Sequence, residues 1–228
     1  MRIGIIGAMD EAMACMRDAL AGAEEQLGGG FTLYRGELEG KEVVVSKSGI
    51  GKVNAAVSTQ CLLLEGVDAV IFTGVAGALD PELGVGDLVV STDLVQHDVD
   101  VSALGYALGE VPGEGLAWAA DARLHELALA AAREAPDVQV KAGRIVSGDQ
   151  FIADAAKVRW LRRTFGAVCA EMEGASAAQV CARYRVPFVV VRSISDAADD
   201  HAEGDFRAFA ELAAFQAERV VRAMLRRL

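Results

Sequence analysis

The chain has 228 residues, 53% of them hydrophobic, which is enough to bury one sizeable core. Its 22 Lys and Arg residues stand against 33 Asp and Glu residues, which gives a formal net charge of -11 at pH 7. Negative charge repels the phosphates of nucleic acids and the headgroups of anionic lipids. We therefore expect neither a nucleic acid nor a membrane as a partner.

The first apolar run of the chain is only about five residues long, too short for the core of a signal peptide or for a spanning helix. The four cysteines form no C-x-x-C pair, so they give no sign of a redox motif. No repeat, low-complexity tract or flexible linker divides the sequence. We expect one domain that spans residues 1–228 and lies in the cytoplasm.

Short β-branched runs alternate along the chain with longer alanine-rich stretches, a pattern typical of a buried sheet covered by helices. The runs that predict strands are 2–7, 42–48, 68–73, 87–91, 138–147, 167–171 and 188–194. Residues 188–191 read Phe-Val-Val-Val without a polar break, which indicates a central strand buried on both faces. Gly28, Gly29 and Gly30 predict a loop or hairpin turn before Phe31.

Helix-forming residues fill the stretches between these strands. The predicted helices are 51–65, 121–135, 153–165, 174–184 and 205–228. The last helix has one apolar stripe, with residues three or four apart, formed by Phe209, Ala213, Ala217, Val220, Met224 and Leu228. We expect that stripe to pack on the sheet. Residues 98–115, rich in glycine, form the one long irregular segment, and such loops often serve function or an interface.

Three familiar motifs fail. A phosphate-binding loop at 48–52 would need Gly in place of Ser46 and Ser or Thr in place of Val53. The three histidines have no second His or Cys at metal-ligand spacing, so we expect no metal; they are His97, His125 and His201. No G-x-S-x-G elbow occurs, which removes the main sign of a serine hydrolase.

Five segments follow predicted strands, at the sheet edge where ligands gather in α/β proteins. They are 7–11, 73–78, 147–152, 171–174 and 193–196. Each one alone is weak evidence, because an acidic residue at a strand end is often a helix cap.

Together, however, the chain resembles the 5'-methylthioadenosine/S-adenosylhomocysteine nucleosidases of the nucleoside phosphorylase superfamily almost from end to end. The matching stretches, in the family's order and spacing, are IGIIGAM, KSGIGKVNAA, TGVAGAL, VGDLVVS, HDVDVSALGY, GRIVSGDQFI, AEMEGAS and VPFVVVRSISDAAD. The resemblance implies a single three-layer α/β/α domain with a mixed, partly barrel-like central sheet, usually paired as a homodimer. It also implies hydrolysis of the N-glycosidic bond of an adenine thionucleoside, with no cofactor.

The resemblance assigns roles to individual residues. Asp196 would donate a proton to N7 of the departing adenine, with Ser195 beside it, and desolvation would have to raise its pKa. Glu173 would accept hydrogen bonds from the ribose hydroxyls, alongside Met172 and Glu171. The adenine would lie against Phe151 and be read by the backbone of Ile152. Other pocket positions are Met9, Ile50, Ala76, Gly77 and Phe206, and the residues expected to reach a neighbouring subunit's pocket are Val101, Leu104 and Tyr106.

Ala12 is the main departure from the family, because relatives carry there the glutamate that activates water. Alanine accepts no proton, and a general base typically contributes about 10²–10⁴-fold to a rate. Three explanations stand: another base has taken over, the chain is an inactive binding homologue, or the substitution was made to trap intact substrate. We favour the third, since the other site positions look intact. Val75 is a second departure, where many relatives have a small polar residue.

Two rivals to the nucleosidase remain at this stage. A nucleoside phosphorylase would use phosphate in place of water and should carry arginines around it, whereas Arg192 is the one obvious candidate. The other rival is a catalytically dead nucleoside-binding protein, and Ala12 is the sole evidence for it.

Overall fold

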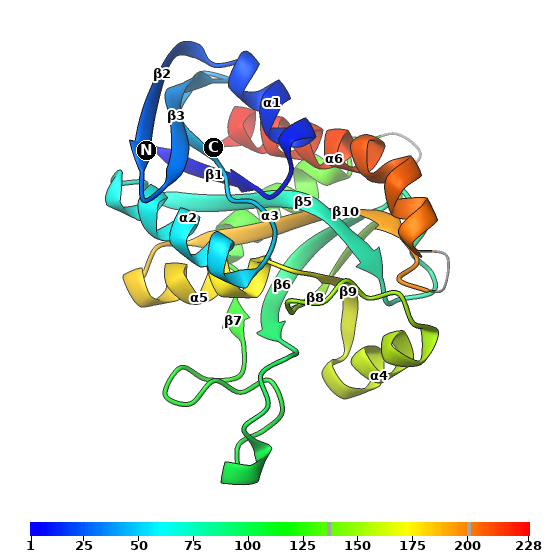
Figure 1. Ribbon diagram of the computed structural model, residues 1–228. Coiled ribbons are helices and arrows are strands. Elements are labelled where there is room, and N and C mark those ends of the chain that lie inside the picture. The colour runs from blue at the N-terminus through cyan, green and yellow to red at the C-terminus, as the bar shows by residue number, and fades with distance from the viewer. Residues whose placement is uncertain (136–137, 200–201) are drawn as a thin grey trace.

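The computed structural model describes residues 1–135, 138–199 and 202–228, with the side chains of residues 10–12 outside that description. Ten strands form one sheet (Figure 1): β1 (Ile3–Gly7), β2 (Ala21–Gly28), β3 (Phe31–Leu38), β4 (Lys41–Lys47), β5 (Ala69–Ala78), β6 (Leu88–Gln96), β7 (Trp118–Ala119), β8 (Val140–Ser147), β9 (Ala167–Glu171) and β10 (Phe188–Asp196). The helices are α1 (Asp10–Asp18), α2 (Lys52–Leu64), α3 (Ala122–Ala132), α4 (Ala155–Phe165), α5 (Gly174–Tyr184) and α6 (Ala202–Arg227).

The sheet is mixed and partly closed, as the resemblance implied. Its strand order is β10-β6-β8-β9-β5-β1-β4-β3-β2, and an additional pairing of β10 with β5 closes the first five strands into a barrel. Strands β1, β4, β5 and β10 run parallel, whereas β10 pairs with β6, and β5 with β9, in antiparallel fashion. The carboxyl ends of β1, β5 and β10 therefore meet at one edge.

Helices cover both faces of this sheet (Figure 1). On β5, Val70 and Phe72 belong to the core that includes residues of α2 and α5, while Ala69 and Ile71 belong to the core shared with α1, α3 and α6. Alternate side chains of a strand point to opposite faces, so β5 is buried on both sides. This explains why its sequence, like that of β10, is almost continuously apolar.

The predicted strands and helices all occur, but the chain also contains elements that the sequence did not indicate. Helix α1 and strands β2, β3 and β7 were not predicted. Strand β2 is exposed along nearly its whole length, so it has no alternation of apolar and polar residues to reveal it. The expected turn is confirmed: Gly29 and Gly30, both with positive φ, join β2 to β3 in a two-residue hairpin loop.

Strand β5 continues five residues beyond its predicted end at Thr73. Gly74 and Gly77 lie in this extension, although glycine weakens a strand. The structure gives the reason for them. A Cβ on Gly74 would stand 2.6 Å from Nη1 of Arg192, and one on Gly77 would stand 2.9 Å from Oδ1 of Asp196. Both glycines therefore allow polar side chains of β10 to pass close to the backbone of β5.

The apolar stripe of α6 is confirmed from Ala213 to Met224, whereas the prediction for Phe209 is wrong because this side chain is exposed. Phe209 lies in the first turns of α6, which border a cavity through Phe206 instead of covering the sheet. Residues 98–115 are largely irregular, with a short 3-10 helix, η1 (Ser102–Leu104), and project from the body as an arm (Figure 1). No helix in the described part of the chain is long and apolar enough to cross a membrane.

Candidate active site

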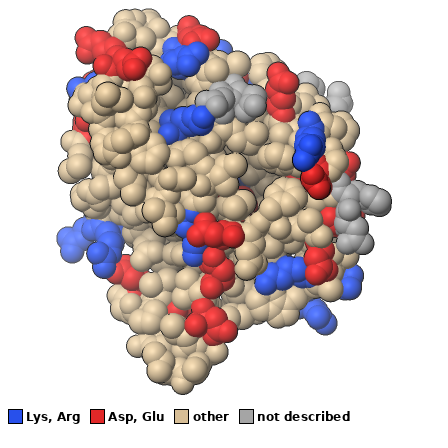
Figure 2. Space-filling model, in the orientation of Figure 1, with Lys and Arg blue, Asp and Glu red and all other residues tan. Residues whose placement is uncertain are grey.

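A cavity of about 350 Å³ opens where β1, β5, β9 and β10 end. It brings together twelve of the residues that the sequence assigned to the site: Met9, Ile50, Ala76, Gly77, Phe151, Ile152, Glu171, Met172, Glu173, Ser195, Asp196 and Phe206. They come from seven separate parts of the chain. The fold brings these parts together at one edge of the sheet, beside the starts of two helices. Figure 2 shows this side of the molecule, with charged residues scattered among uncharged ones.

Three of the assigned residues lie elsewhere. Val101, Leu104 and Tyr106 belong to the arm and do not line the cavity of their own chain; Leu104 is 76% exposed. The side chain of Ala12 lies outside the described residues, although Ala8 and Met9, which lead into α1, line the cavity. The cavity is also lined by residues of the predicted edge segments that had no assigned role, namely Gly7, Ala8, Thr73, Gly74, Val75 and Gln150, and by Arg192, which the sequence offered only as a phosphate ligand. The sequence missed Ala170, Ala198 and Ala214.

Asp196 ends β10 and is buried against the cavity, with 2% of its surface exposed. A register shift between Ile194 and Asp196 in the pairing with β5 turns its side chain out of the strand's regular alternation. Oδ2 accepts the hydroxyl of Ser195 at 2.8 Å, and Oδ1 accepts the N–H of Ala198 at 2.8 Å. Ala198 has a positive φ of 53°, which is uncommon for a residue with a side chain.

Burial raises the pKa of Asp196 above that of a free aspartate. The two hydrogen bonds act the other way, because they favour the ionised carboxylate, and the nearby carboxylates Asp205 and Asp199 raise the pKa further. Desolvation is the largest of these effects. A carboxyl group that holds its proton in a buried cavity is suited to act as a general acid.

Aromatic rings line the same cavity. Phe151 and Phe206 meet edge to face, with ring centroids 5.6 Å apart. Phe151 is half exposed at the cavity mouth, so one side of its ring is free for another flat ring to stack on it. A purine that stacks there would lie in the cavity that Asp196 also lines.

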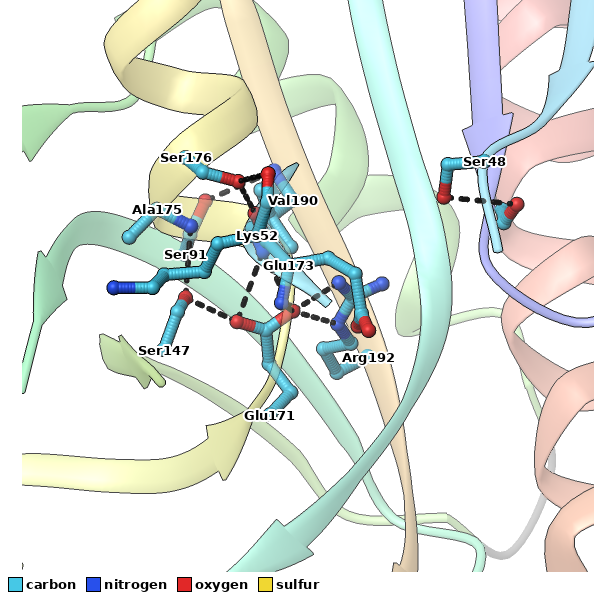
Figure 3. A network of polar contacts seen from close by, with 12 residues as sticks. Ser48, Lys52, Ser91, Ser147, Glu171, Glu173, Ala175, Ser176, Val190 and Arg192 are labelled. Atoms are coloured by element: carbon cyan, nitrogen blue, oxygen red, sulfur yellow. Dashed lines mark hydrogen bonds and ion pairs between the residues drawn. The ribbon is translucent and has the colours of Figure 1, made fainter. Parts of the chain in front are cut away.

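Glu171 and Arg192 form a buried ion pair deeper in the site (Figure 3). Nε and Nη2 of Arg192 both donate to Oε2 of Glu171, and the guanidinium lies 4.5 Å from the centre of the Phe72 ring. The carboxylate of Glu171 also accepts the hydroxyl of Ser147 and the N–H of Gly174, at the start of α5. Glu171 therefore caps a helix and neutralises Arg192, which is the only cation among the described lining residues.

Glu173 lies between the starts of two helices. It precedes α5, and its Oε1 accepts the N–H of Gly51, at the start of α2, at 2.8 Å. Burial, and next the charge of Glu171, raise the pKa of Glu173 from 4.5 to about 7, while Arg192 opposes that rise. Among the described residues no three His, Cys, Asp or Glu side chains converge as a metal-binding group.

The raised pKa of Glu173 predicts a pH-dependent cost in stability. The folded chain binds this proton more tightly than the unfolded chain, so the free energy of unfolding falls as pH rises from about 4.5 to about 7. The loss should be on the order of 3 kcal/mol, since one pKa unit corresponds to about 1.4 kcal/mol. Urea unfolding at pH 5 and pH 8 should show a smaller pH dependence in Glu173→Gln than in the parent. An equal dependence, or one that the exposed control Glu126→Gln also loses, would contradict this.

Comparison with known proteins agrees with the geometry. A family profile described as "Phosphorylase superfamily" matches residues 2–226. A 5'-methylthioadenosine/S-adenosylhomocysteine nucleosidase of Anoxybacillus flavithermus is 46% identical over 230 residues, which cover 100% of this chain and 99% of the relative.

Solved structures show the same relation. The 5'-methylthioadenosine/S-adenosylhomocysteine nucleosidase of Neisseria meningitidis, in complex with methylthio-immucillin-A, matches with a TM-score of 0.96 at 41% identity, over 100% of this chain and 99% of that one. Futalosine hydrolase of Helicobacter pylori matches with a TM-score of 0.93 at 39% identity, over 100% and 98%. The chain belongs to the phosphorylase superfamily and, within it, to the 5'-methylthioadenosine/S-adenosylhomocysteine nucleosidases.

Proposed function

We propose that this chain hydrolyses the N-glycosidic bond of 5'-methylthioadenosine and S-adenosylhomocysteine, releasing adenine and the thioribose. The observation that carries the proposal is the buried carboxyl group of Asp196, with its raised pKa, in a cavity whose mouth holds the Phe151 ring. A purine leaves a sugar more easily when a positioned acid protonates it.

One group of cavity residues acts on the adenine and another acts on the ribose. Asp196 protonates N7 of an adenine that stacks on Phe151, and the backbone of Ile152 reads the edge of the base. Glu173 and Met172 face the ribose, where a carboxylate also stabilises the positive charge that develops on the sugar. The electron pair of the broken C1'–N9 bond passes into the adenine, and water attacks C1'.

Phosphorolysis fits this site less well than hydrolysis. A phosphate would need an available cation, but Glu171 engages Arg192 through two nitrogens, and Arg192 is the only Lys or Arg among the described lining residues. A phosphate placed there would have to displace a buried carboxylate partner, which is strongly unfavourable.

Adenine release from 5'-methylthioadenosine, measured with and without phosphate, tests the proposal. We expect free adenine and methylthioribose at a rate that phosphate leaves unchanged. A sugar 1-phosphate product would establish a phosphorylase, and tight binding of intact substrate without turnover, in this chain and in Ala12→Glu, would establish a binding protein. S-adenosylhomocysteine and futalosine are assayed in parallel, because a futalosine hydrolase shares the fold.

We also propose that the whole chain acts as one domain and pairs as a homodimer. Support comes from apolar residues left exposed on α2, just before it and on the arm, namely Ile50, Val53, Val57, Leu104 and Tyr106. Ile50 borders the cavity, and the tip of the arm shows no charged residue in Figure 2. Large exposed apolar surfaces of this kind mark interfaces.

Disruption of this surface should separate the two copies. In light scattering after size exclusion, we expect the parent chain to run as a dimer and Val53→Asp as a monomer, because a buried unpaired carboxylate is costly. Leu212→Asp, at an exposed position of α6, serves as the matched control and should stay dimeric. A parent that is monomeric at micromolar concentration would contradict the pairing.

A further inference from the structure

We propose that Glu173 is the general base of this chain, taking the proton from the water that attacks the sugar. The inference rests on the proposed hydrolysis and assigns a group to the step that Ala12 cannot perform. It gives Glu173 a second task beside its contact with the ribose.

Elimination among the lining carboxyl groups leads to Glu173. The described residues of the cavity include three, Glu171, Glu173 and Asp196. Asp196 has to hold its proton in order to donate it. Glu171 is engaged by Arg192, by Ser147 and by the N–H of Gly174. Glu173 accepts the N–H of Gly51 and forms no ion pair with any described residue, so its carboxylate keeps capacity for a further hydrogen bond.

One unsatisfied hydroxyl in the same cavity suits a bound water. Thr73 is fully buried and lines the cavity, yet its hydroxyl has no hydrogen-bond partner. On the next residue of β5, Gly74 leaves room for Arg192: Nη1 would stand only 2.6 Å from a Cβ there, while Nε and Nη2 donate to Glu171. Register pairs Gly74 with Arg192 and Thr73 with Val191, so the Thr73 hydroxyl and the Arg192 guanidinium leave opposite faces of the strands, and both line the cavity at the strand ends. A buried polar atom without a partner is costly, and a bound water removes that cost.

Charges around Glu173 suit it to this task. Glu171, on β9, disfavours the ionisation of Glu173, whereas Arg192, on β10, favours it. At the start of α2, Gly51 donates its N–H to Glu173, and the charge of Lys52 is paired with Asp98. Figure 3 shows the side chains of Glu173 and Arg192 extending toward each other. The resulting pKa of about 7 is close to the best value for a base at neutral pH.

The step balances as follows. A lone pair of the water forms the O–C1' bond, and its proton passes to the ionised Glu173. The C1'–N9 bond breaks, its electron pair enters the adenine, and N7 takes the proton of Asp196. Both carboxyl groups then return to their starting states by exchange with solvent.

Four proteins test the proposal: the parent, Glu173→Gln, Ala12→Glu and the double variant. In the parent, kcat should rise with pH through about 7, and Glu173→Gln should lower it by about 10²-fold or more. In the Ala12→Glu background, the second carboxylate should shift the rise of kcat to lower pH. It should also reduce the loss of kcat caused by Glu173→Gln to about tenfold or less. Equal losses in both backgrounds would show a ribose contact alone and overturn the proposal.

Controls separate this proposal from folding and from the proposed function. Glu218→Gln removes another buried glutamate, outside the cavity, and should leave kcat unchanged. If Glu173→Gln fails to fold, Glu173→Asp serves instead, and its kcat should be lower than that of the parent but still rise with pH. A kcat that no longer rises with pH would count against Glu173 as the base. Thr73→Val should lower kcat several-fold with KM unchanged, and an unchanged kcat would remove the water position. Adenine release by Ala12→Glu but not by the parent would refute the base while hydrolysis stands, whereas release by neither would refute hydrolysis.

Discussion

Asp196→Asn should lower kcat/KM for 5'-methylthioadenosine by about 10²–10⁴-fold, the usual contribution of a general acid. Asparagine has nearly the same shape, and its one oxygen can still accept the N–H of Ala198 while its amide donates to the Ser195 hydroxyl, but it has no acidic proton to give to N7. The loss should appear mainly in kcat, because the cavity and the Phe151 ring remain. Steady-state adenine release and equilibrium binding of the intact nucleoside measure the two effects separately.

The matched control for this variant is Asp154→Asn. Asp154 caps the start of α4 outside the cavity, and asparagine caps helices about as well as aspartate. Its kcat/KM should stay within about twofold of the parent value, as expected for a surface change without a role. A loss below tenfold in Asp196→Asn, or a raised KM with unchanged kcat, would mean that Asp196 only binds substrate.

The parent enzyme should also lose activity at high pH. An acid works only while protonated, so the rate should fall as pH rises through the raised pKa of Asp196.

Ala12→Glu should raise kcat by between about 10-fold and 10³-fold, less than the full contribution of a general base because Glu173 already supplies part of it. Position 12 lies in the first turn of α1, directly after Ala8 and Met9, which line the cavity. A carboxylate there would also gain from the positive end of the helix dipole. KM should change little, since the substrate-facing residues are the same.

Ala12→Gln is the control for this gain. Glutamine matches glutamate in length but accepts no proton, so its kcat should equal that of the parent. A similar gain in both variants would assign the effect to packing or helix propensity. Absence of any gain in Ala12→Glu would count against a substitution made to trap substrate. With an inactive parent it would favour the binding homologue, and with an active parent it would favour a replacement base.

Sequence by itself determined much of this protein. The apolar runs placed β1, β4, β9 and β10 within a few residues of their observed bounds, because a strand buried on both faces must be almost continuously hydrophobic. The resemblance indicated the mixed, barrel-like sheet, the family and the residues that gather at one cavity, and it drew attention to Ala12.

Only the tertiary structure decided the rest, because it depends on which distant groups share a buried space. The sequence could not show that Arg192 forms an ion pair with Glu171 or that the hydroxyl of Thr73 has no partner. Nor could it show that burial beside Glu171 raises the pKa of Glu173 to about 7. It also left β2 unrecognised, since an exposed edge strand carries no apolar pattern. Ionisation and hydrogen-bond balance follow from neighbours in space, and those neighbours can be far apart in the chain: Gly51 and Glu173 are separated by 122 residues.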